Sequence, residues 1–245
     1  MKAASAIIIA LLVLVVAMLI GGAVWALGAL NATSATVRKG KAVDFKELNS
    51  SAEHGQIVFA GDSITEGFNV NEHFGQLISG KRLYNRGISG ETSTELLSRI
   101  EDDVLSIDPS DIVILVGTND LAGSASLEDI AGNIESIVEL SKKKCPGANI
   151  ILQGVYPVNP AVTRRFQGIL VGHGRTTERI KELNGLLESA ATRNGVKWVD
   201  LTSDLSGSDG LLKPEYTYDG LHVNGKAYEV IAEKIAPFLS GYVGG

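Results

Sequence analysis

Residues 56–64 read QIVFAGDSI, an apolar run that stops at a Gly-Asp-Ser turn containing Ser63. A short apolar run closed by turn-forming residues is typical of a buried strand. Residues 111–120 repeat the pattern as DIVILVGTND, with Asn119 in the turn after the run. Buried strands that end in small and polar residues predict an α/β fold with those residues at one edge of its sheet.

The rest of the chain after residue 55 alternates between short apolar runs and helical periodicity. The expected strands span residues 56–60, 81–85, 111–116, 149–155 and 196–200. The residues expected to cap the intervening helices are Thr92 with Glu95, Ser126, Thr176 or Thr177, and Asn224. Strands separated by helices of this length need right-handed crossovers. We therefore expect a mainly parallel five-stranded sheet covered by helices on both faces.

Glycine and polar motifs follow the expected strands in order. Ser63 follows the first strand, Gly87 the second and Asn119 the third, while Asp219 and His222 precede the last helix. Because the carboxyl ends of parallel strands meet at one edge, we expect these residues on one rim. A hydroxyl, a backbone donor, an amide donor and a carboxylate–imidazole pair are the parts of an acyl-transfer site. Each motif alone is ordinary turn chemistry, but their joint occurrence favours catalysis.

These motifs resemble those of the SGNH hydrolases, also called GDSL-type esterases and lipases. The family's Ser, Gly, Asn and His markers match Ser63, Gly87, Asn119 and His222, and the resemblance runs from about residue 56 to residue 239. Ile64 stands where the family name has Leu, which is a conservative departure. The resemblance implies a flavodoxin-like three-layer α/β/α sandwich and a serine esterase that acts through an acyl-enzyme intermediate.

The resemblance and the chemistry together assign roles. Ser63 is expected to attack the ester carbonyl, while His222 takes its proton and later gives it to the leaving alcohol. Asp219 is expected to hold the other ring nitrogen of His222. The oxyanion hole is expected to consist of the backbone N–H groups of Ser63 and Gly87 and the side-chain amide of Asn119.

Other chemistries leave little trace in the sequence. There is no Gly-x-Ser-x-Gly elbow, no glycine-rich nucleotide-binding motif and no His-Glu-x-x-His. His54, His73 and His173 are too far apart to offer metal-ligand spacing, and Cys145 is the only cysteine. A net charge of -6 argues against nucleic acid as a partner. We expect an enzyme without a metal or cofactor.

The N-terminal region has a different composition. Residues 6–30 carry no charged or strongly polar side chain, and a membrane-spanning helix needs about 20 apolar residues. We expect residues 1–30 to be a membrane anchor, residues 31–54 a polar connector and residues 55–245 the hydrolase domain, held outside the cytoplasm. The alternative is a signal peptide, cleaved at small residues near positions 28 or 34, that releases a secreted protein.

The substrate is less closely specified than the reaction. We favour a short acyl ester, acetyl above all, on a cell-surface or extracellular glycan. The alternatives are a lysophospholipase or thioesterase acting on lipid acyl groups and, in another class, a non-catalytic cell-surface binding module. Residues 157–174, which include His173, leave the end of a strand and either roof the site or form an ordinary surface excursion.

Overall fold

The computed structural model describes residues 2–163 and 165–244, and within the helices it leaves the side chains of residues 2–10, 27, 30, 31, 165 and 166 undescribed. The chain divides into two compact units, Met1–Lys41 and Ala42–Gly245. The second unit contains the sheet and all the motifs identified above.

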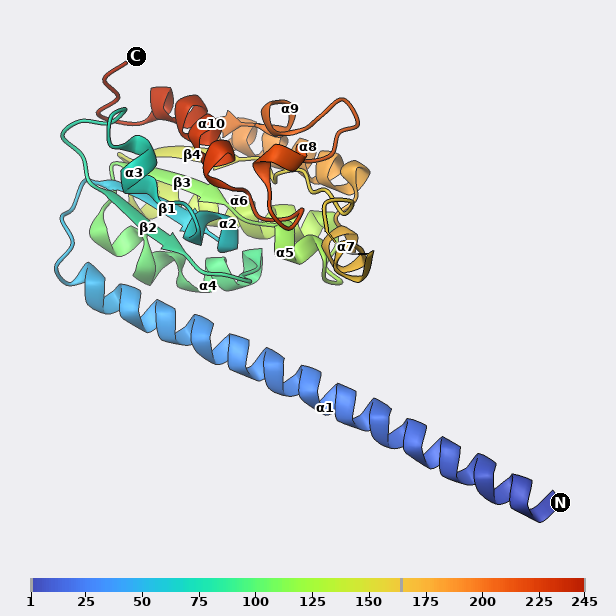
Figure 1. Cartoon of the computed structure of the whole chain (residues 1–245). Coiled ribbons are helices and arrows are strands. Elements are labelled where there is room, and N and C mark those ends of the chain that lie inside the picture. The colour runs from blue at the N-terminus through green and yellow to red at the C-terminus, as the bar shows by residue number, and fades with distance from the viewer. Residues whose placement is uncertain (1, 164, 245) are drawn as a thin grey trace. The chain divides into compact units, whose positions relative to one another are not determined.

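The sheet of the second unit is fully parallel and has five strands in the order β2-β1-β3-β4-β5 (Figure 1). The strands are β1 Ile57–Gly61, β2 Leu83–Gly87, β3 Asp111–Leu115, β4 Asn149–Gln153 and β5 Lys197–Val199. In the register of the sheet, Gly61 lies beside Gly87 on one side and beside Leu115 on the other. The strand order reverses at β1, and this switch point is where α/β sheets bind ligands.

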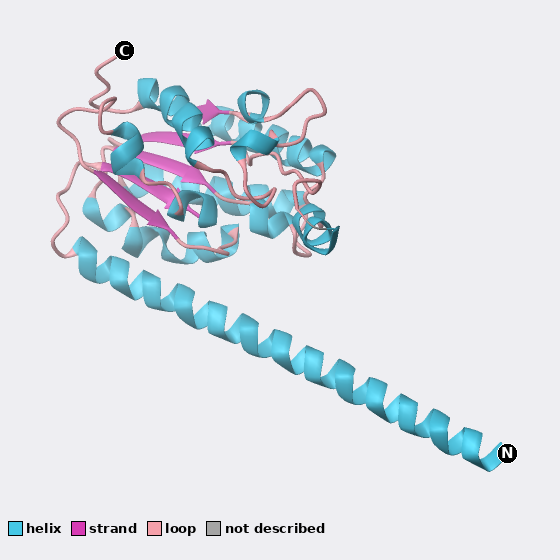
Figure 2. Ribbon diagram, viewed as in Figure 1, coloured by secondary structure: helices cyan, strands magenta, loops and turns pink. Residues whose placement is uncertain are grey.

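Helices cover both faces of the sheet (Figure 2). They are α2 Ser63–Glu66, α3 Val70–Phe74, α4 Ser93–Asp103, α5 Thr118–Leu121, α6 Leu127–Lys144, α7 Arg165–Gly172, α8 Thr177–Asn194, α9 Thr202–Leu205 and α10 Gly225–Ile235. Alternate strand residues point to opposite faces. Val58 and Ile112 pack in one core with α4, α6 and α8, whereas Phe59 and Val113 pack in the other with α3 and α10. The expected three-layer sandwich is confirmed.

Helix starts follow the expected capping chemistry. Thr92 and Glu95 form a complete capping box at α4, and Ser126 accepts a hydrogen bond from a backbone N–H in the first turn of α6. Thr176 and Asn224 do the same at α8 and α10. The capping predictions are therefore confirmed, and Thr176 rather than Thr177 is the N-cap of α8, which begins at Thr177.

Each of the five strands differs from the sequence prediction by one or two residues at one end or both. The second strand begins at Leu83 and runs on through Arg86 to Gly87, because β2 is an edge strand and tolerates polar residues. Residues 157–174, which follow β4, contain helix α7, an element that the sequence analysis does not predict.

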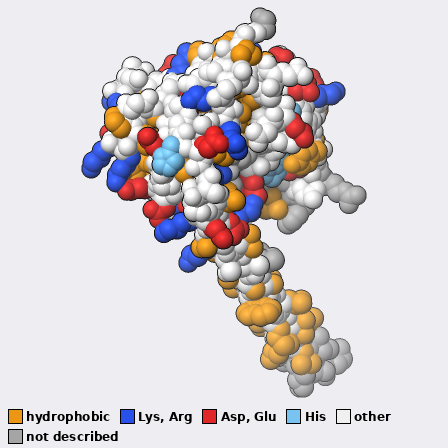
Figure 3. Space-filling model, turned by 90° about the vertical axis from the view of Figure 1, so that its left-hand side faces the viewer, with side chains coloured by type: hydrophobic (Ala, Val, Ile, Leu, Met, Phe, Trp, Pro, Cys, Tyr) orange, Lys and Arg blue, Asp and Glu red, His pale blue; other side chains and the backbone are white. Residues whose placement is uncertain are grey.

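Helix α1 runs over Lys2–Asn49, so the expected polar connector at 31–54 is helical up to Asn49. Large apolar side chains between Leu11 and Trp25 are exposed (Figure 3). Among the residues searched, no helix is both long and apolar enough to cross a membrane. The structure does not support the expected membrane-spanning helix at 6–30, a segment that lies partly outside the described side chains.

The last two turns of α1 belong to the second unit and contact its helical layer. Asn49 Oδ1 accepts hydrogen bonds from Nε and Nη2 of Arg86, at 3.2 and 2.8 Å. Asn49 Nδ2 donates to the carbonyl oxygens of Asp102 and Asp103, at 3.2 and 3.0 Å, where α4 ends. The guanidinium carbon of Arg86 also lies 5.0 Å from the centre of the Phe45 ring.

Candidate active site

Ser63 is the first residue of α2, directly after β1. Asp62 caps this helix, because its Oδ1 accepts a hydrogen bond from the backbone N–H of Ile64 at 2.9 Å. Gly61 allows β1 to approach its neighbour closely: a Cβ atom there would lie 2.0 Å from the carbonyl oxygen of Leu115. The serine is thus held in a tight strand-to-helix turn at the switch point of the sheet.

Ser63, His222 and Asp219 form a continuous hydrogen-bonded chain. Nε2 of His222 lies 3.0 Å from Oγ of Ser63, and Nδ1 lies 2.6 Å from Oδ2 of Asp219. The other carboxylate oxygen, Oδ1, accepts the backbone N–H groups of Leu221 and His222 at 2.9 and 2.8 Å. This is the geometry of a nucleophile, a base and a residue that orients the base.

The carboxyl group of Asp219 is held in its ionised form. Partial burial raises the pKa of Asp219, but hydrogen bonds from the His222 ring and from the backbone N–H groups of Leu221 and His222 outweigh burial and leave the pKa below its ordinary value. An ionised Asp219 accepts a hydrogen bond from Nδ1–H of His222, which leaves Nε2 free to take a proton from the serine.

Thr217 and Gly220 shape the loop that carries the imidazole. Gly220 has a φ of +84°, and its N–H donates to Oγ1 of Thr217 at 2.8 Å. The Thr217 hydroxyl donates in turn to the carbonyl oxygen of His222 at 2.7 Å. The loop is therefore fixed in place before any substrate binds.

Gly87 and Asn119 lie at the ends of the two strands beside β1, as expected. The N–H of Gly87 donates to Oδ1 of Asn85 at 2.8 Å, and Nδ2 of Asn119 donates to the carbonyl oxygen of Glu91 at 2.9 Å. Nδ2 carries a second hydrogen that can point to an oxyanion. The Gly87 N–H must share its hydrogen with Asn85 or exchange partners, a contact that the sequence analysis did not anticipate.

Residues 59–230 match the GDSL-like Lipase/Acylhydrolase family. The chain belongs to this family. This acylhydrolase is 29% identical over 190 residues to the platelet-activating factor acetylhydrolase IB subunit alpha2 of Rattus norvegicus, a match that covers 77% of each chain. The alpha1 subunit from the same organism is 27% identical over 195 residues, or 78% of each chain. A GDSL-like lipase from Bacteroides thetaiotaomicron has a TM-score of 0.68 at 28% identity, over 80% of this chain and 95% of that one.

Beside Ser63 the acylhydrolase has a small pocket of about 320 Å³. Ser63 and His222 line it, together with residues that include Asn69, His73, Tyr218, Asn224 and Tyr228. Tyr218 stacks alongside His222 with ring centroids 6.3 Å apart and planes 13° apart. In the sequence His73 is an isolated histidine and Tyr218 belongs to no motif. Neither is recognisable as a pocket residue, because the pocket joins segments about 150 residues apart.

The segment 157–174 of the acylhydrolase contacts the loop of His222, and the adjoining Arg175 contacts the turn that precedes Asn119. The backbone N–H of Asn159 donates to the carbonyl oxygen of Gly220 at 2.7 Å. Arg175, just after the segment, donates from Nε to the carbonyl oxygen of Thr118 at 2.8 Å and from Nη1 to two carbonyl oxygens in α7. His173 is exposed and does not line the described pocket. The segment is therefore hydrogen-bonded to the loop of His222, although none of its residues lines the described pocket.

Two aspartates of the acylhydrolase motifs have structural partners. Asp120 accepts hydrogen bonds from the backbone N–H and the hydroxyl of Ser93, the latter at 2.6 Å. Asp62 is fully buried, and burial raises its pKa to about 7, against a smaller lowering by the hydrogen bond from Ile64. Neither carboxyl group replaces Asp219 beside the imidazole.

Proposed function

We propose that this ester hydrolase removes short acyl groups, acetyl above all, from polar alcohols such as the sugars of a cell-surface or extracellular glycan. The observation that carries the proposal is the pocket of about 320 Å³ beside Ser63 and His222. This volume is at the lower end of ligand-binding pockets, so it suits a small polar alcohol such as a single sugar unit. Two relatives are named acetylhydrolases, which supports acetyl as the acyl group.

The position of the pocket relative to the imidazole indicates which part of the ester it would hold. Nε2 of His222 must hand its proton to the leaving alcohol, so that alcohol lies on the side of Ser63 where His222 lies. The pocket is on this side. Tyr218 is 70% exposed there, next to polar side chains. An exposed ring among hydrogen-bonding groups suits the apolar face and the hydroxyls of a sugar.

In the proposed reaction, Ser63 attacks the ester carbonyl as His222 takes its proton, and Asp219 stabilises the imidazolium that forms. The tetrahedral oxyanion is held by the backbone N–H groups of Ser63 and Gly87 and by the second amide hydrogen of Asn119. The intermediate collapses as the C–O bond to the alcohol breaks and His222 gives its proton to the departing alcohol. Water, deprotonated by His222, then attacks the acyl-enzyme, and the second intermediate releases the carboxylic acid while His222 returns the proton to Ser63. No step needs a metal or a cofactor.

The test is hydrolysis of p-nitrophenyl esters from acetyl to palmitoyl by the full-length chain, beside its Ser63→Ala variant. We expect kcat/KM to be highest for acetyl and to be lost in Ser63→Ala. A wild-type chain that hydrolyses no chain length, or a Ser63→Ala variant with full activity, would contradict the mechanism. A second assay tests whether the alcohol part of the ester is a sugar. Tyr218→Ala should raise KM for an acetylated monosaccharide and leave KM for ethyl acetate unchanged. Equal effects on the two KM values would contradict a sugar as the alcohol.

A lipid acyl group is the second candidate, because α7 presents exposed apolar side chains beside the site. Ile169 is 63% exposed and Leu170 is 56% exposed, in the segment that contacts the loop of His222. Exposed apolar side chains near a site can contact a long acyl chain. A preference for octanoyl or palmitoyl esters in the same assay, reduced by Leu170→Ser, would favour this candidate.

The proposed location is outside the cytoplasm, with the domain either tethered or released by cleavage. Support comes only from the sequence, since residues 6–30 contain no charged side chain. The N-terminal residue of the mature protein tests this: a start near residue 29 or 35 means cleavage, and Met1 means retention. A cytosolic fraction containing all of the protein would contradict the proposal.

A further inference from the structure

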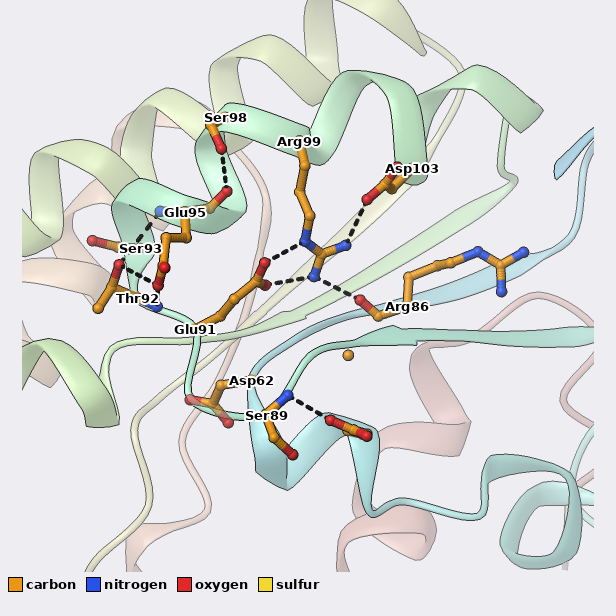
Figure 4. A network of polar contacts seen from close by, with 12 residues as sticks. Asp62, Arg86, Ser89, Glu91, Thr92, Ser93, Glu95, Ser98, Arg99 and Asp103 are labelled. Atoms are coloured by element: carbon orange, nitrogen blue, oxygen red, sulfur yellow. Dashed lines mark hydrogen bonds and ion pairs between the residues drawn. The ribbon is translucent and has the colours of Figure 1, made fainter. Parts of the chain in front are cut away.

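A buried ion cluster lies beneath the loop that follows β2, and its centre is the guanidinium of Arg99 (Figure 4). Nε and Nη2 of Arg99 each lie 2.6 Å from a carboxylate oxygen of Glu91, and Nη1 lies 3.3 Å from Oδ2 of Asp103. The three residues are 8%, 3% and 2% exposed. Buried charges are costly even when paired, and apolar residues often replace such pairs without loss of stability. Stability alone therefore does not explain why this cluster of charges is buried here.

Arg99 also binds the backbone of the proposed oxyanion hole. Its Nη2 donates to the carbonyl oxygen of Arg86 at 2.8 Å, whereas the Arg86 side chain points away from the cluster (Figure 4). The Arg86 carbonyl and the Gly87 N–H belong to one planar trans peptide unit and point in opposite directions. A contact that fixes the carbonyl therefore fixes the direction of the Gly87 N–H.

The same guanidinium acts on the other outlying donor through Glu91. The Glu91 side chain is held by two hydrogen bonds from Arg99, and its carbonyl oxygen accepts Nδ2 of Asn119 at 2.9 Å. This bond occupies one amide hydrogen and directs the second. One buried cation thus links the residues that orient both Gly87 and Asn119.

The positive charge of Arg99 acts on the Gly87 N–H in addition to orienting it. A cationic donor on a carbonyl oxygen polarises the peptide unit and strengthens its N–H as a hydrogen-bond donor. Burial raises the pKa of Glu91 and Asp103 above its ordinary value, and Arg99 opposes this shift by favouring their ionised forms. The cluster keeps a positive group on the carbonyl side of the Arg86–Gly87 peptide, opposite the Gly87 N–H.

We infer that Arg99 is a positioning residue for the oxyanion hole: it orients and polarises the Gly87 N–H through the Arg86 carbonyl and sets the Asn119 amide through Glu91. The inference rests on the proposed esterase function. It predicts that changes at Arg99 affect the transition state, where the oxyanion exists, far more than the ground-state complex.

The first test is Arg99→Lys, which keeps a buried cation but has one nitrogen in place of the fork that reaches both Glu91 and the Arg86 carbonyl. We expect kcat for p-nitrophenyl acetate to fall by about 10- to 100-fold with KM within about twofold of wild type. The matched control is Arg193→Lys, which changes the Arg193–Glu135 pair between α8 and α6 and should leave kcat unchanged.

The second test separates positioning from general stability by a double-mutant cycle with Asn119→Ala. Because part of the effect passes through Asn119, Arg99→Lys should cost several-fold less in the Asn119→Ala background than in the wild type. If Arg99 had a purely structural role, the fold-losses in kcat of the two single variants would multiply in the double variant. Glu91→Gln serves as the second variant should Arg99→Lys not fold, and it should also lower kcat without raising KM.

The inference is overturned if Arg99→Lys or Glu91→Gln folds and keeps the wild-type kcat, or if a rise in KM accounts for the whole loss in kcat/KM. It is also overturned if the losses of Arg99→Lys and Asn119→Ala multiply fully in the double variant. Its failure is distinct from failure of the proposed function. In the former case the wild type hydrolyses p-nitrophenyl acetate and only the Arg99 result differs, whereas in the latter the wild type hydrolyses no ester.

Discussion

Replacing Gly87 with Ala should impair the enzyme through displacement of the nucleophile. A Cβ atom at this position would lie 2.3 Å from the backbone nitrogen of Glu66 and 2.8 Å from the carbonyl carbon of Thr65. Both atoms belong to α2, the short helix that begins at Ser63. Backbone atoms cannot turn aside as a flexible side chain does, so the helix or β2 must shift.

The size of the shift follows from the contact distance. Ordinary contacts begin near 3.4 Å, so the 2.3 Å approach requires a displacement of about 1 Å. A misplacement of about 1 Å costs about 10²-fold in rate, and this one acts on the 3.0 Å contact between Ser63 and His222. Because alanine keeps the backbone N–H, the loss would come from displacement rather than from a missing oxyanion donor.

The assay is kcat and KM for p-nitrophenyl acetate together with the urea midpoint of unfolding, for wild type, Gly87→Ala and Gly132→Ala. Gly132 lies within α6, where a Cβ would meet nothing within 4 Å. Its replacement should leave kcat unchanged and stabilise the helix by roughly 0.5–1 kcal/mol. Wild-type kcat in Gly87→Ala would refute the steric reasoning.

Three further predictions concern single polar groups. Asn119→Ala should lower kcat for p-nitrophenyl acetate by about 10²- to 10³-fold, because one oxyanion donor is lost, and a loss below tenfold would contradict the assigned role. Asp219→Asn should lower kcat by about 10⁴-fold at neutral pH, because an amide no longer selects the reactive tautomer of His222; kcat within tenfold of wild type would contradict this. In the native chain, burial raises the pKa of Asp62 from 3.8 to about 7. As pH rises, the unfolded chain therefore loses this proton before the native chain does, and the free energy of unfolding falls between about pH 4 and pH 7. Urea unfolding at pH 5 and 8 should show this fall reduced in Asp62→Asn, whereas equal falls in both proteins would contradict the raised pKa.

Local patterns in the sequence predict most of the domain. Strand positions follow from short apolar runs, and helix starts follow from residues such as Thr92 and Asn224, whose side chains bond to the backbone within the next turn. The spacing of Asp219 and His222 also brings them into contact within one loop, as expected. These features are predictable because each depends on residues close together along the chain.

Contacts between distant segments were not predictable in this way. Arg99 reaches the Arg86 carbonyl only because α4 packs beside the end of β2, and nothing in its helical periodicity distinguishes it from a solvated arginine. Tyr218 and His73 share a pocket only because α3 and α10 lie on the same face of the sheet. Helical structure in 31–49 was missed for another reason: polar composition indicated a connector, although many of these residues are good helix formers.

The last turns of α1 bear on where the domain can be cut for production. A fragment that begins at residue 55, just before the first strand, would lack Asn49, which bonds to Arg86 and to the carbonyl oxygens at the end of α4. It would also expose the guanidinium of Arg86, which now packs against Phe45. The loosened groups adjoin the peptide held by Arg99. A soluble fragment should therefore begin no later than Ala42, and catalytic losses measured on shorter fragments would reflect a missing helix end rather than a weak enzyme.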